Sequence, residues 1–370
     1  MSKVKIDIVS RIHIGSGDTL QYGSDFINFQ EDNDKWIGII SPRKIMSLIK
    51  DDTKALNAWI ATIERKKSII DFMKAYVPNA IIDDYCIRID QTSETLKETD
   101  TLQTFIHDAL GRPYIPGSSI KGAIRTAILS NIIKDKTEIK NSINPSKINA
   151  RAIEQKLLGE NPNKDIFRFL KIGDAIFGDY YENIVRLYSI NEREKNSFWD
   201  TTKGQMVETL MPKDSSTCDM KLDLNAYKNA KECVQTLPEC MTSLKDIFST
   251  INQHSETLLN QEIKYWQDQV DKPNADNVDK YIKGLDTIMN QIQQCKKESK
   301  STCILRLGAG SGWRFITGAW AENLENFNED IVPAARPHNQ RYTDYSFPKS
   351  RRVDKNCKPL GFIRMTLLET

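Results

Sequence analysis

The stretch from Tyr114 to Leu129, YIPGSSIKGAIRTAIL, constrains the fold most, because it leads a strand end through a Pro-Gly turn into a helix. The apolar residues recur at the spacing of one helix face, and they are Ile120, Ala123, Ile124, Ala127 and Ile128. Ser118, Lys121 and Arg125 fall together on another face, because residues three and four apart are neighbours on a helix. With Ser119, they surround a helix start whose free backbone N–H groups attract anions. The stretch predicts a phosphate site, or alternatively a capped amphipathic helix with a solvated basic edge.

The same stretch resembles a P-loop only in part. Gly117 to Gly122 fits the spacing G-x-x-x-x-G, but Ala123 and Ile124 follow where the motif needs lysine and then serine or threonine. The sequence therefore argues against a nucleotide triphosphatase. The phosphates of a polymer remain as the ligand.

The composition is that of an ordinary globular protein. The chain has 370 residues, which suggests two domains, and 39% of them are hydrophobic. The formal net charge is only +2, so a nucleic-acid partner would have to meet a local basic patch. The seven cysteines form no C-x-x-C pair, which argues against a disulfide framework or a zinc site. We find no apolar run of about 18 residues and no signal peptide, and expect a cytoplasmic protein without membrane contact.

The order of the elements predicts an α+β fold rather than a parallel doubly wound sheet. We expect a first domain over 1–180 and a second over 181–370. The expected strands cover 3–14, 26–29, 36–40, 81–89, 102–106, 167–177, 184–190 and 303–307, with a hairpin formed by 205–211 and 218–224. A helix is expected to start at Ser41-Pro42, where serine serves as N-cap. Residues from about 225 to 300 read as a helical insertion that either packs only on itself or docks another subunit.

Two glycine-rich segments follow strands. The first is His13-Ile14-Gly15-Ser16-Gly17, and the second is Gly308-Ala309-Gly310-Ser311-Gly312, followed by Trp313 and Arg314. In the second segment the third glycine is not at the spacing of the dinucleotide motif G-x-G-x-x-G, and the acidic residue that follows such a motif is not evident. Both loops instead suit a close approach of backbone amides to phosphates. His13 is a candidate general base or phosphate contact, or a structural histidine at a strand end.

The segment from Arg336 to Arg364 is the most basic and aromatic part of the chain. Its cations and rings include Arg336, His338, Arg341, Tyr342, Tyr345, Phe347, Lys349, Arg351, Arg352, Lys355 and Lys358. Interleaved cations and aromatic rings suit single-stranded nucleic acid, through phosphate contact and base stacking. A solvated loop is the alternative.

Taken together, these motifs resemble the RAMP superfamily of CRISPR-associated proteins. The resemblance is carried by the two glycine-rich segments, by Ile115 to Arg125 and by Pro359-Leu360-Gly361-Phe362, and it is closest to subunits that cap type III-A (Csm) effector complexes. It implies two ferredoxin-like (RRM-like) halves, with the helical insertion in the second half. The implied partners are CRISPR RNA, target RNA, the backbone RAMP subunits and the small helical subunit of the complex. The implied role is to cap the backbone filament at the 3′ end of the CRISPR RNA and to support its maturation.

The expected RNA-binding residues come from all of these segments. They are His13, Gly15, Ser16, Gly17, Ser118, Ser119, Lys121, Gly122, Arg125, Gly308, Gly310, Ser311, Gly312, Arg314, Arg341, Arg351 and Arg352. We expect no cofactor, no metal and no catalytic residue. One alternative is a metal-independent endoribonuclease that processes CRISPR RNA with His13 as general acid or base. Another is a structural subunit that makes no RNA contact.

Overall fold

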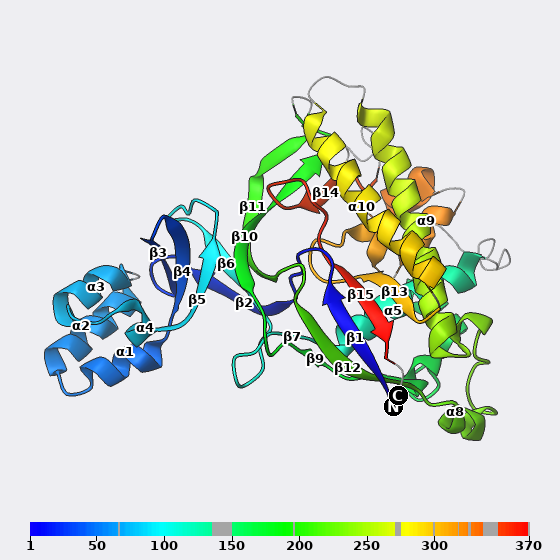
Figure 1. Ribbon diagram of the computed structural model, residues 1–370, viewed down its shortest axis with the longest axis horizontal. Coiled ribbons are helices and arrows are strands. Elements are labelled where there is room, and N and C mark those ends of the chain that lie inside the picture. Colours follow the sequence, from blue (N-terminus) through cyan, green and yellow to red (C-terminus); the bar gives the residue numbers. More distant parts are fainter. Residues whose placement is uncertain are drawn as a thin grey trace.

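The computed structural model describes residues 1–65, 67–134, 150–194, 197–270, 275–298, 300–316, 318–324, 327–335 and 347–368 (Figure 1). Within these ranges helices and strands mix along the whole chain, and the predicted α+β fold is confirmed. Two large sheets organise the molecule, and helices cover one of them.

The first sheet joins strands from both ends of the chain. Its five strands lie in the order β13 (Thr302–Arg306), β15 (Phe362–Leu367), β1 (Ser2–Ile8), β12 (Ser215–Leu222) and β8 (Leu170–Ile172), and each neighbouring pair is antiparallel. Helices α5 (Gly117–Lys134) and α9 (Leu244–Val270) pack against it. In chain order β1, α5, β8, β12, α9 and β15 follow the ferredoxin-like pattern β-α-β-β-α-β.

The second sheet has eight strands and extends away from the first (Figure 1). Its path is β2 (Gly15–Gln21), β6 (Thr101–Phe105), β11 (Trp199–Leu210), β10 (Glu182–Asn191), β5 (Cys86–Thr92), β4 (Asp34–Ile40) and β3 (Phe26–Glu31), and β14 (Ser350–Val353) pairs with β10. A small lobe at the β3 end contains α1 (Pro42–Ile49), α2 (Thr53–Glu64), α3 (Ile69–Tyr76) and α4 (Ile82–Tyr85). Ser41 caps α1 by accepting a hydrogen bond from the Lys44 N–H, as predicted.

Shorter elements complete the description. They are the two-stranded pair β7 (Tyr114–Ile115) and β9 (Ala175–Ile176), helices α7 (Ala150–Leu158), α8 (Leu224–Ala230) and α11 (Val332–Ala335), the 3-10 helices η2 (Ile166–Phe169), η3 (Glu239–Met241), η4 (Trp313–Phe315) and η5 (Ala319–Asn323), and the π-helix η6 (Phe327–Ile331). The seven cysteines lie in the described ranges, and none of them forms a disulfide. Among the helices in the described ranges, none is long and apolar enough to cross a membrane.

Several strand predictions were wrong. The expected strand over 3–14 ends at Ile8 in β1, and the expected strand over 167–177 begins as the 3-10 helix η2 and is then divided between β8 and β9. β11 and β12 do not form the expected hairpin, because β11 pairs with β10 and β6 while β12 pairs with β1 and β8. The turn at Pro212 to Asp214 therefore carries the chain from one sheet to the other. The expected strand over 81–89 begins as the one-turn helix α4, and only its second part enters β5.

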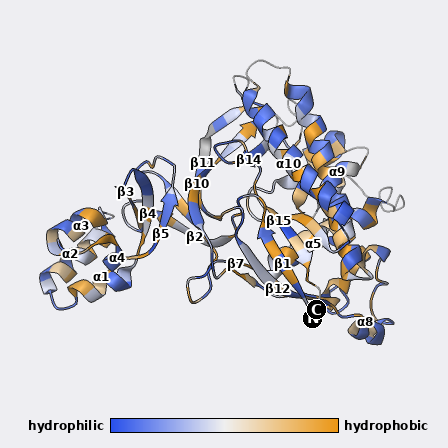
Figure 2. Ribbon diagram, viewed as in Figure 1, coloured by the Kyte–Doolittle hydropathy of each residue, from blue (hydrophilic) through white to orange (hydrophobic). Residues whose placement is uncertain are grey.

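The helical insertion does not pack only on itself. The N-terminal part of α9 buries Ile247, Phe248 and Ile251 in the core of the first sheet. Its C-terminal part buries Trp266 against α10 (Asp276–Glu298), and both helices show apolar stripes beside polar ones (Figure 2). The helices predicted over 225–300 are confirmed, and α9 is part of the central core.

The expected domain boundary at residue 180 stays a prediction. Both sheets take strands from each side of that residue, because β1 pairs with β12 and β15, and β5 and β6 pair with β10 and β11. A division of the chain into sequential halves therefore does not separate the two sheets.

Candidate functional site

Three of the motif segments meet at one end of the first sheet. The N–H of Ala309 donates to the carbonyl oxygen of His13 over 2.9 Å. The N–H of Gly361 donates to the carbonyl oxygen of Arg11, and that of Leu307 to the carbonyl oxygen of Gly361, each over 2.9 Å. The chain thus brings both glycine-rich segments and the closing Pro-Leu-Gly-Phe segment together.

The glycines in this junction serve first to pack the backbone of one segment against another. Gly308 has a φ of +83°, and a Cβ there would lie 2.6 Å from the carbonyl oxygen of His13. Gly310 lies against Arg352 and Leu360. Among the glycines of this junction, Gly17 and Gly312 are the positions where an added Cβ would meet open space, so they leave room for a partner. Ser311 is buried within the same loop.

His13 is a core residue. Its side chain is 1% exposed, and its Nδ1–H donates to the carbonyl oxygen of Glu208 over 2.7 Å. The ring meets Phe105 edge to face at a centroid distance of 6.1 Å. Burial lowers the pKa of His13, and the hydrogen bond to Glu208 only partly opposes this effect. We therefore leave its side chain out of the proposed RNA surface, since it does not reach solvent.

The residues after His13 remain accessible. Gly15, Ser16 and Gly17 begin strand β2, which is an exposed edge strand of the eight-stranded sheet. Ser16 Oγ lies 2.6 Å from Thr104 Oγ1 on the neighbouring strand β6. An edge strand leaves one side of its backbone without a ladder partner, so amides and hydroxyls there can contact phosphates.

The start of α5 differs from the predicted phosphate site. The N–H of Gly117 donates to Asp174 Oδ1 over 2.8 Å, so the protein's own carboxylate already binds this helix end. A Cβ at Gly117 would lie 2.2 Å from the carbonyl oxygen of Ile172, so glycine is needed there for close packing. Ser118 is exposed and Ser119 half-buried just beyond this cap.

Lys121 and Arg125 do share one face of α5, as predicted. They line a groove of about 440 Å³, together with Arg151 and Arg168. Arg125 donates to Asp165 over 2.7 Å, lies 3.6 Å from Glu154, and stacks over the Phe167 ring. Gly122 is exposed on the same helix, and a Cβ there would meet open space.

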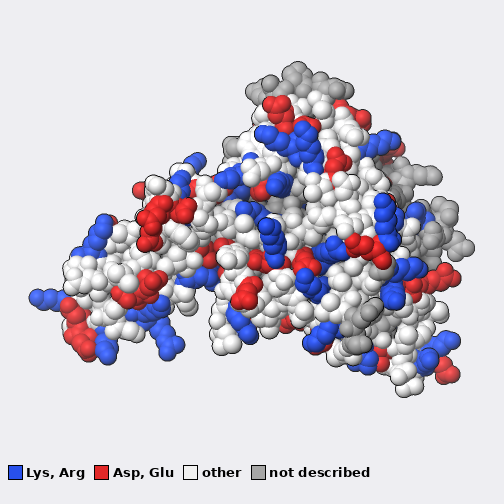
Figure 3. All heavy atoms as spheres, viewed as in Figure 1, with Lys and Arg blue, Asp and Glu red and all other residues white. Residues whose placement is uncertain are grey.

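The groove, which we call the α5 groove, is lined by four cations and by the acids Glu154, Glu160 and Asp165, so it has a small excess of positive charge. Burial lowers the pKa of Lys121, Asp165 partly opposes this, and Arg125 lowers it further. A bound phosphate would relieve the repulsion between the two cations. Elsewhere, basic and acidic side chains are interspersed on the face shown in Figure 3, in keeping with the small net charge.

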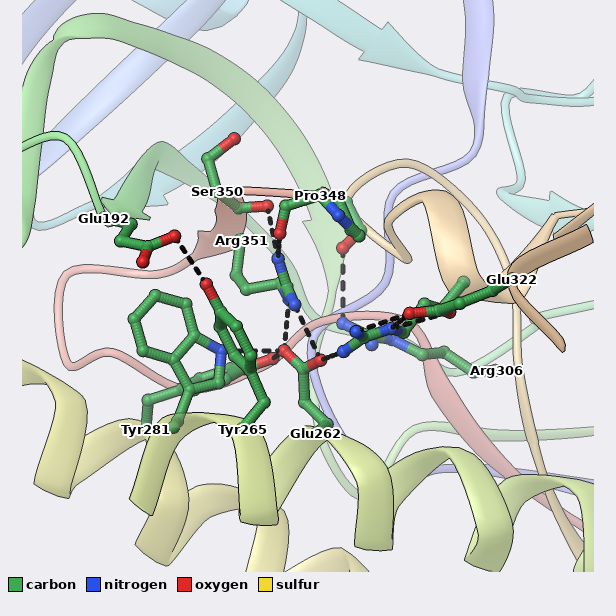
Figure 4. Close-up of polar contacts among 12 residues, drawn as sticks. Glu192, Glu262, Tyr265, Tyr281, Arg306, Glu322, Pro348, Ser350 and Arg351 are labelled. Atoms are coloured by element: carbon green, nitrogen blue, oxygen red, sulfur yellow. Dashed lines mark hydrogen bonds and ion pairs between the residues drawn. The ribbon is translucent and has the colours of Figure 1, made fainter. Parts of the chain in front are cut away.

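The expected RNA contacts Arg314 and Arg351 belong instead to a buried ion cluster, which we call the Glu262 cluster (Figure 4). Arg351 Nη2 donates to Glu262 Oε2 over 2.9 Å, and Arg314 also pairs with Glu262. Arg314 Nη2 lies 2.7 Å from Glu322. We leave both arginines out of the proposed RNA surface, because buried carboxylates hold their guanidinium groups.

Two aromatic donors complete the Glu262 cluster. Trp266 Nε1 and the Tyr281 hydroxyl donate to Glu262 Oε1 over 2.9 and 3.1 Å. Burial by itself would raise the pKa of Glu262, but the two arginines outweigh it and lower the pKa to about 2. Sequence reasoning missed Glu262, whose only signal is its place four residues before Trp266 on the buried stripe of α9.

The last part of the predicted site is only partly described. Arg352 is half-buried on β14, where its backbone pairs with Ser189 of β10. Arg341 and most of the basic, aromatic segment before Phe347 lie outside the described residues.

A second buried charge cluster lies beneath His13. Arg88 contacts Glu208, Asp90 at 3.1 Å and Glu182 at 3.7 Å, and His107 Nε2 lies 3.0 Å from Glu182. The ligand atoms of His107, Glu182 and Glu208 lie within 4.8 Å of one another, which is a metal-like arrangement. Arg88 already supplies the positive charge there, so the cluster fits an ion-pair network better than a cation site.

Comparison with known proteins places this architecture in a family. The sequence pattern of the RAMP superfamily matches residues 5–315, and the chain belongs to that superfamily.

Among curated proteins, the chain is 24% identical over 401 residues to the CRISPR system Cms protein Csm5 of Methanocaldococcus jannaschii, covering 99% of this chain and 89% of that protein. It is 42% identical over 55 residues to Csm5 of Streptococcus thermophilus, covering 15% of each chain.

Two solved structures share the fold. A chain of the cryo-EM structure of a Csm-crRNA-target RNA ternary complex from a type III-A CRISPR-Cas system aligns with a TM-score of 0.69 at 18% identity, covering 100% of both chains. The crystal structure of T.onnurineus Csm5 aligns with a TM-score of 0.63 at 16% identity, covering 98% of this chain and 100% of the other. The expected resemblance to a fifth Csm subunit is confirmed.

Proposed function

We propose that this chain is a guide-RNA-binding subunit of a type III-A (Csm) CRISPR effector complex. The carrying observation is the similarity to Csm5 of M. jannaschii, which extends over 99% of the chain. In the complex, the chain caps the backbone filament at the 3′ end of the CRISPR RNA and supports maturation of that RNA. Its partners are CRISPR RNA and target RNA, the backbone RAMP subunits and the small helical subunit.

Two surfaces support RNA contact within this proposal. The edge strand β2 offers the backbone of Gly15, Ser16 and Gly17 and the hydroxyl of Ser16, and all three residues are exposed. The α5 groove offers Lys121, whose ammonium is half-buried beside Arg125. Ser118, Ser119 and Gly122 lie on the same helix. Recognition through phosphates and backbone tolerates any RNA sequence, as a guide-holding subunit requires.

Lys121 gives the sharpest test, because Arg125→Ala would also leave the carboxylate of Asp165 without its partner. We expect Lys121→Ala to weaken binding of the full chain to single-stranded RNA, measured by fluorescence anisotropy over a salt series. Each lost phosphate contact reduces the slope of log affinity against log salt by roughly 0.7. The control is Lys283→Ala, which removes an exposed lysine of α10 that pairs with Asp279.

Unchanged affinity and slope in a folded Lys121→Ala protein would remove the α5 groove from the proposal. Membership of the complex has a separate test. Co-expression with the other Csm subunits and a CRISPR array should yield a complex that contains this chain, and leaving the chain out should change the length of the mature RNA. Recovery of complexes and RNA of unaltered length without the chain would contradict the capping role.

We further propose that the chain itself does not cut RNA. The support is the position of His13, whose buried imidazole donates its Nδ1–H to the Glu208 carbonyl oxygen. A general base must reach the proton that it removes. Incubation of the purified chain with repeat RNA in the presence of a chelator tests this, and cleavage that depends on His13 would establish the endoribonuclease alternative.

A further inference from the structure

A cavity of about 170 Å³ lies between α5, α9 and the 3-10 helix η5, apart from the α5 groove. Its buried lining includes Ala127, Thr250, Ala319 and Trp320. Exposed side chains of Lys134, Gln253 and Gln261 form its rim. The cavity therefore has an enclosed floor and an edge that solvent and ligands can reach.

Two side chains that line this cavity each carry a buried nitrogen atom without a hydrogen-bond partner. Within the part of the chain that the structure describes, neither His254 Nε2 nor Trp320 Nε1 makes a hydrogen bond, although both atoms are buried. Buried polar atoms nearly always make hydrogen bonds in native proteins. Two such atoms without a hydrogen bond, on side chains that line one cavity, indicate that a ligand supplies the partner. The indole N–H can only donate, so that partner must carry an acceptor.

The other polar groups narrow the chemistry of the ligand. Arg314 and Glu322 also line the cavity, but they bond to each other and add no net charge. Burial lowers the pKa of His254 to about 4, so its imidazole is neutral and presents either a donor or an acceptor. A neutral floor with alanine side chains would leave a buried phosphate without a counter-charge, which is costly.

We propose that this cavity binds one nucleobase of single-stranded RNA, with Trp320 Nε1 and His254 Nε2 hydrogen-bonding its edge and Lys134 contacting the adjoining phosphate. A base is planar, carries donors and acceptors side by side on its edge, and has apolar faces that fit between small side chains. The cavity adds base binding to a surface otherwise suited to phosphates. The inference rests on the proposed RNA-binding function.

The test uses the full chain and calorimetric titration with the four nucleoside 5′-monophosphates. Ribose 5-phosphate, which lacks the base, serves as the matched ligand control. We expect at least one monophosphate to bind with one-to-one stoichiometry and ribose 5-phosphate not to bind. Trp320→Phe and His254→Phe should each weaken that binding roughly tenfold, because each removes one buried hydrogen bond to the ligand.

The variants are chosen to leave the fold intact. Trp320→Phe keeps an aromatic ring and removes the indole nitrogen, and His254→Phe keeps a ring and removes both imidazole nitrogens; Trp320 Nε1 and His254 Nε2 have no partner in the described structure. Trp36→Phe, on strand β4 of the second sheet, is the matched control and should bind like the parent chain. Circular dichroism confirms folding before each titration.

Other outcomes would overturn the inference in distinguishable ways. Equal binding of ribose 5-phosphate would make the cavity a phosphate site, and no monophosphate binding at millimolar concentration would reject it as a ligand site. Anisotropy with single-stranded RNA is measured in parallel. Intact RNA binding without monophosphate binding rejects only this inference, whereas monophosphate binding without RNA binding rejects the proposed function.

Discussion

Arg351 Nη2 donates to Glu262 Oε2 over 2.9 Å, and the two residues are 89 positions apart in the chain. This contact ties helix α9 to strand β14, which in turn pairs with β10 of the second sheet. The Glu262 cluster therefore connects the helices that cover one sheet to the edge of the other. It is a buried ionic contact between α9 and β14.

Glu262→Gln should lower the free energy of unfolding by about 3 kcal/mol at neutral pH, because it leaves the buried guanidinium of Arg351 without a carboxylate and Arg314 with Glu322 alone. The folded-state pKa of about 2 lies below the ordinary value of 4.5. The carboxylate thus stabilises the fold above about pH 4.5, and this contribution is lost as pH falls through 2. Urea unfolding of both proteins between pH 3 and 7 measures the difference.

The control for that experiment lies on the same helix. Glu256 pairs with Lys296 at 2.7 Å near the surface, so Glu256→Gln should change the unfolding free energy by less than about 1 kcal/mol. If the two variants behaved alike across this pH range, the Glu262 cluster would not hold α9 in place.

Asp90→Asn should have the opposite pH dependence. Burial raises the pKa of Asp90 to about 7, Arg88 partly opposes this, and Glu208 and Glu182 add to it. The folded state therefore keeps a proton that the unfolded chain releases, so stability from this group is present below about pH 4 and is lost as pH rises through 7. Relative to the parent, the variant should gain stability between pH 5 and 8, by a few kcal/mol at most.

Thermal melting of the parent and of the Asp90→Asn variant at pH 5 and at pH 8 measures this gain in stability. Arg88 keeps its contacts with Glu208 and Glu182 in the variant, so no cation is left alone. A variant that lost as much stability at pH 8 as at pH 5 would show that Asp90 is ionised in the fold.

Gly308→Ala should be markedly destabilising. The positive φ costs a non-glycine residue about 1–3 kcal/mol, and the new Cβ would also lie 2.6 Å from the His13 carbonyl oxygen. Gly312→Ala is the matched comparison, because its φ is +82° but its Cβ would meet open space. The difference between their unfolding midpoints in urea isolates the steric contact. Equal losses would mean that the two loops are not packed against each other.

His13→Ala should weaken the fold by about 1–3 kcal/mol, because the buried carbonyl of Glu208 loses its donor. We expect no loss of a cleavage activity, since the imidazole is part of the core. Denaturant unfolding and gel analysis of repeat RNA together measure both effects. A variant of unchanged stability that had lost metal-independent cleavage would instead make His13 catalytic.

The features that could be predicted from the sequence are local. Ser41 caps α1 through a hydrogen bond to a residue three positions away, and the shared face of Lys121 and Arg125 follows from helix geometry alone. Local patterns could not show that β11 and β12 do not pair with each other. The partner of β12 is β1, and whether two alternating strands pair with each other or with distant strands depends on the whole core.

In the candidate site, too, local features could be predicted and distant contacts could not. The glycine-rich segments could be found, but the contact between Ala309 and His13 is set by strands far apart in the sequence. The carboxylate of Asp174, which caps α5, has no signal in the motif that it completes. A basic residue likewise looks the same in sequence whether it faces solvent or, like Arg351, a buried glutamate.

The position of β1 between β12 and β15 also determines when this protein can fold. Val4 lies opposite Cys218 on one side and Leu367 on the other, so the first strand has no complete place until the last one exists. Such distant pairings make folding slow, because loop closure precedes the contacts that reward it. During synthesis the apolar side of β1 therefore lacks one of its two neighbours until β15 has been made, and transiently exposed apolar strands of this kind favour aggregation.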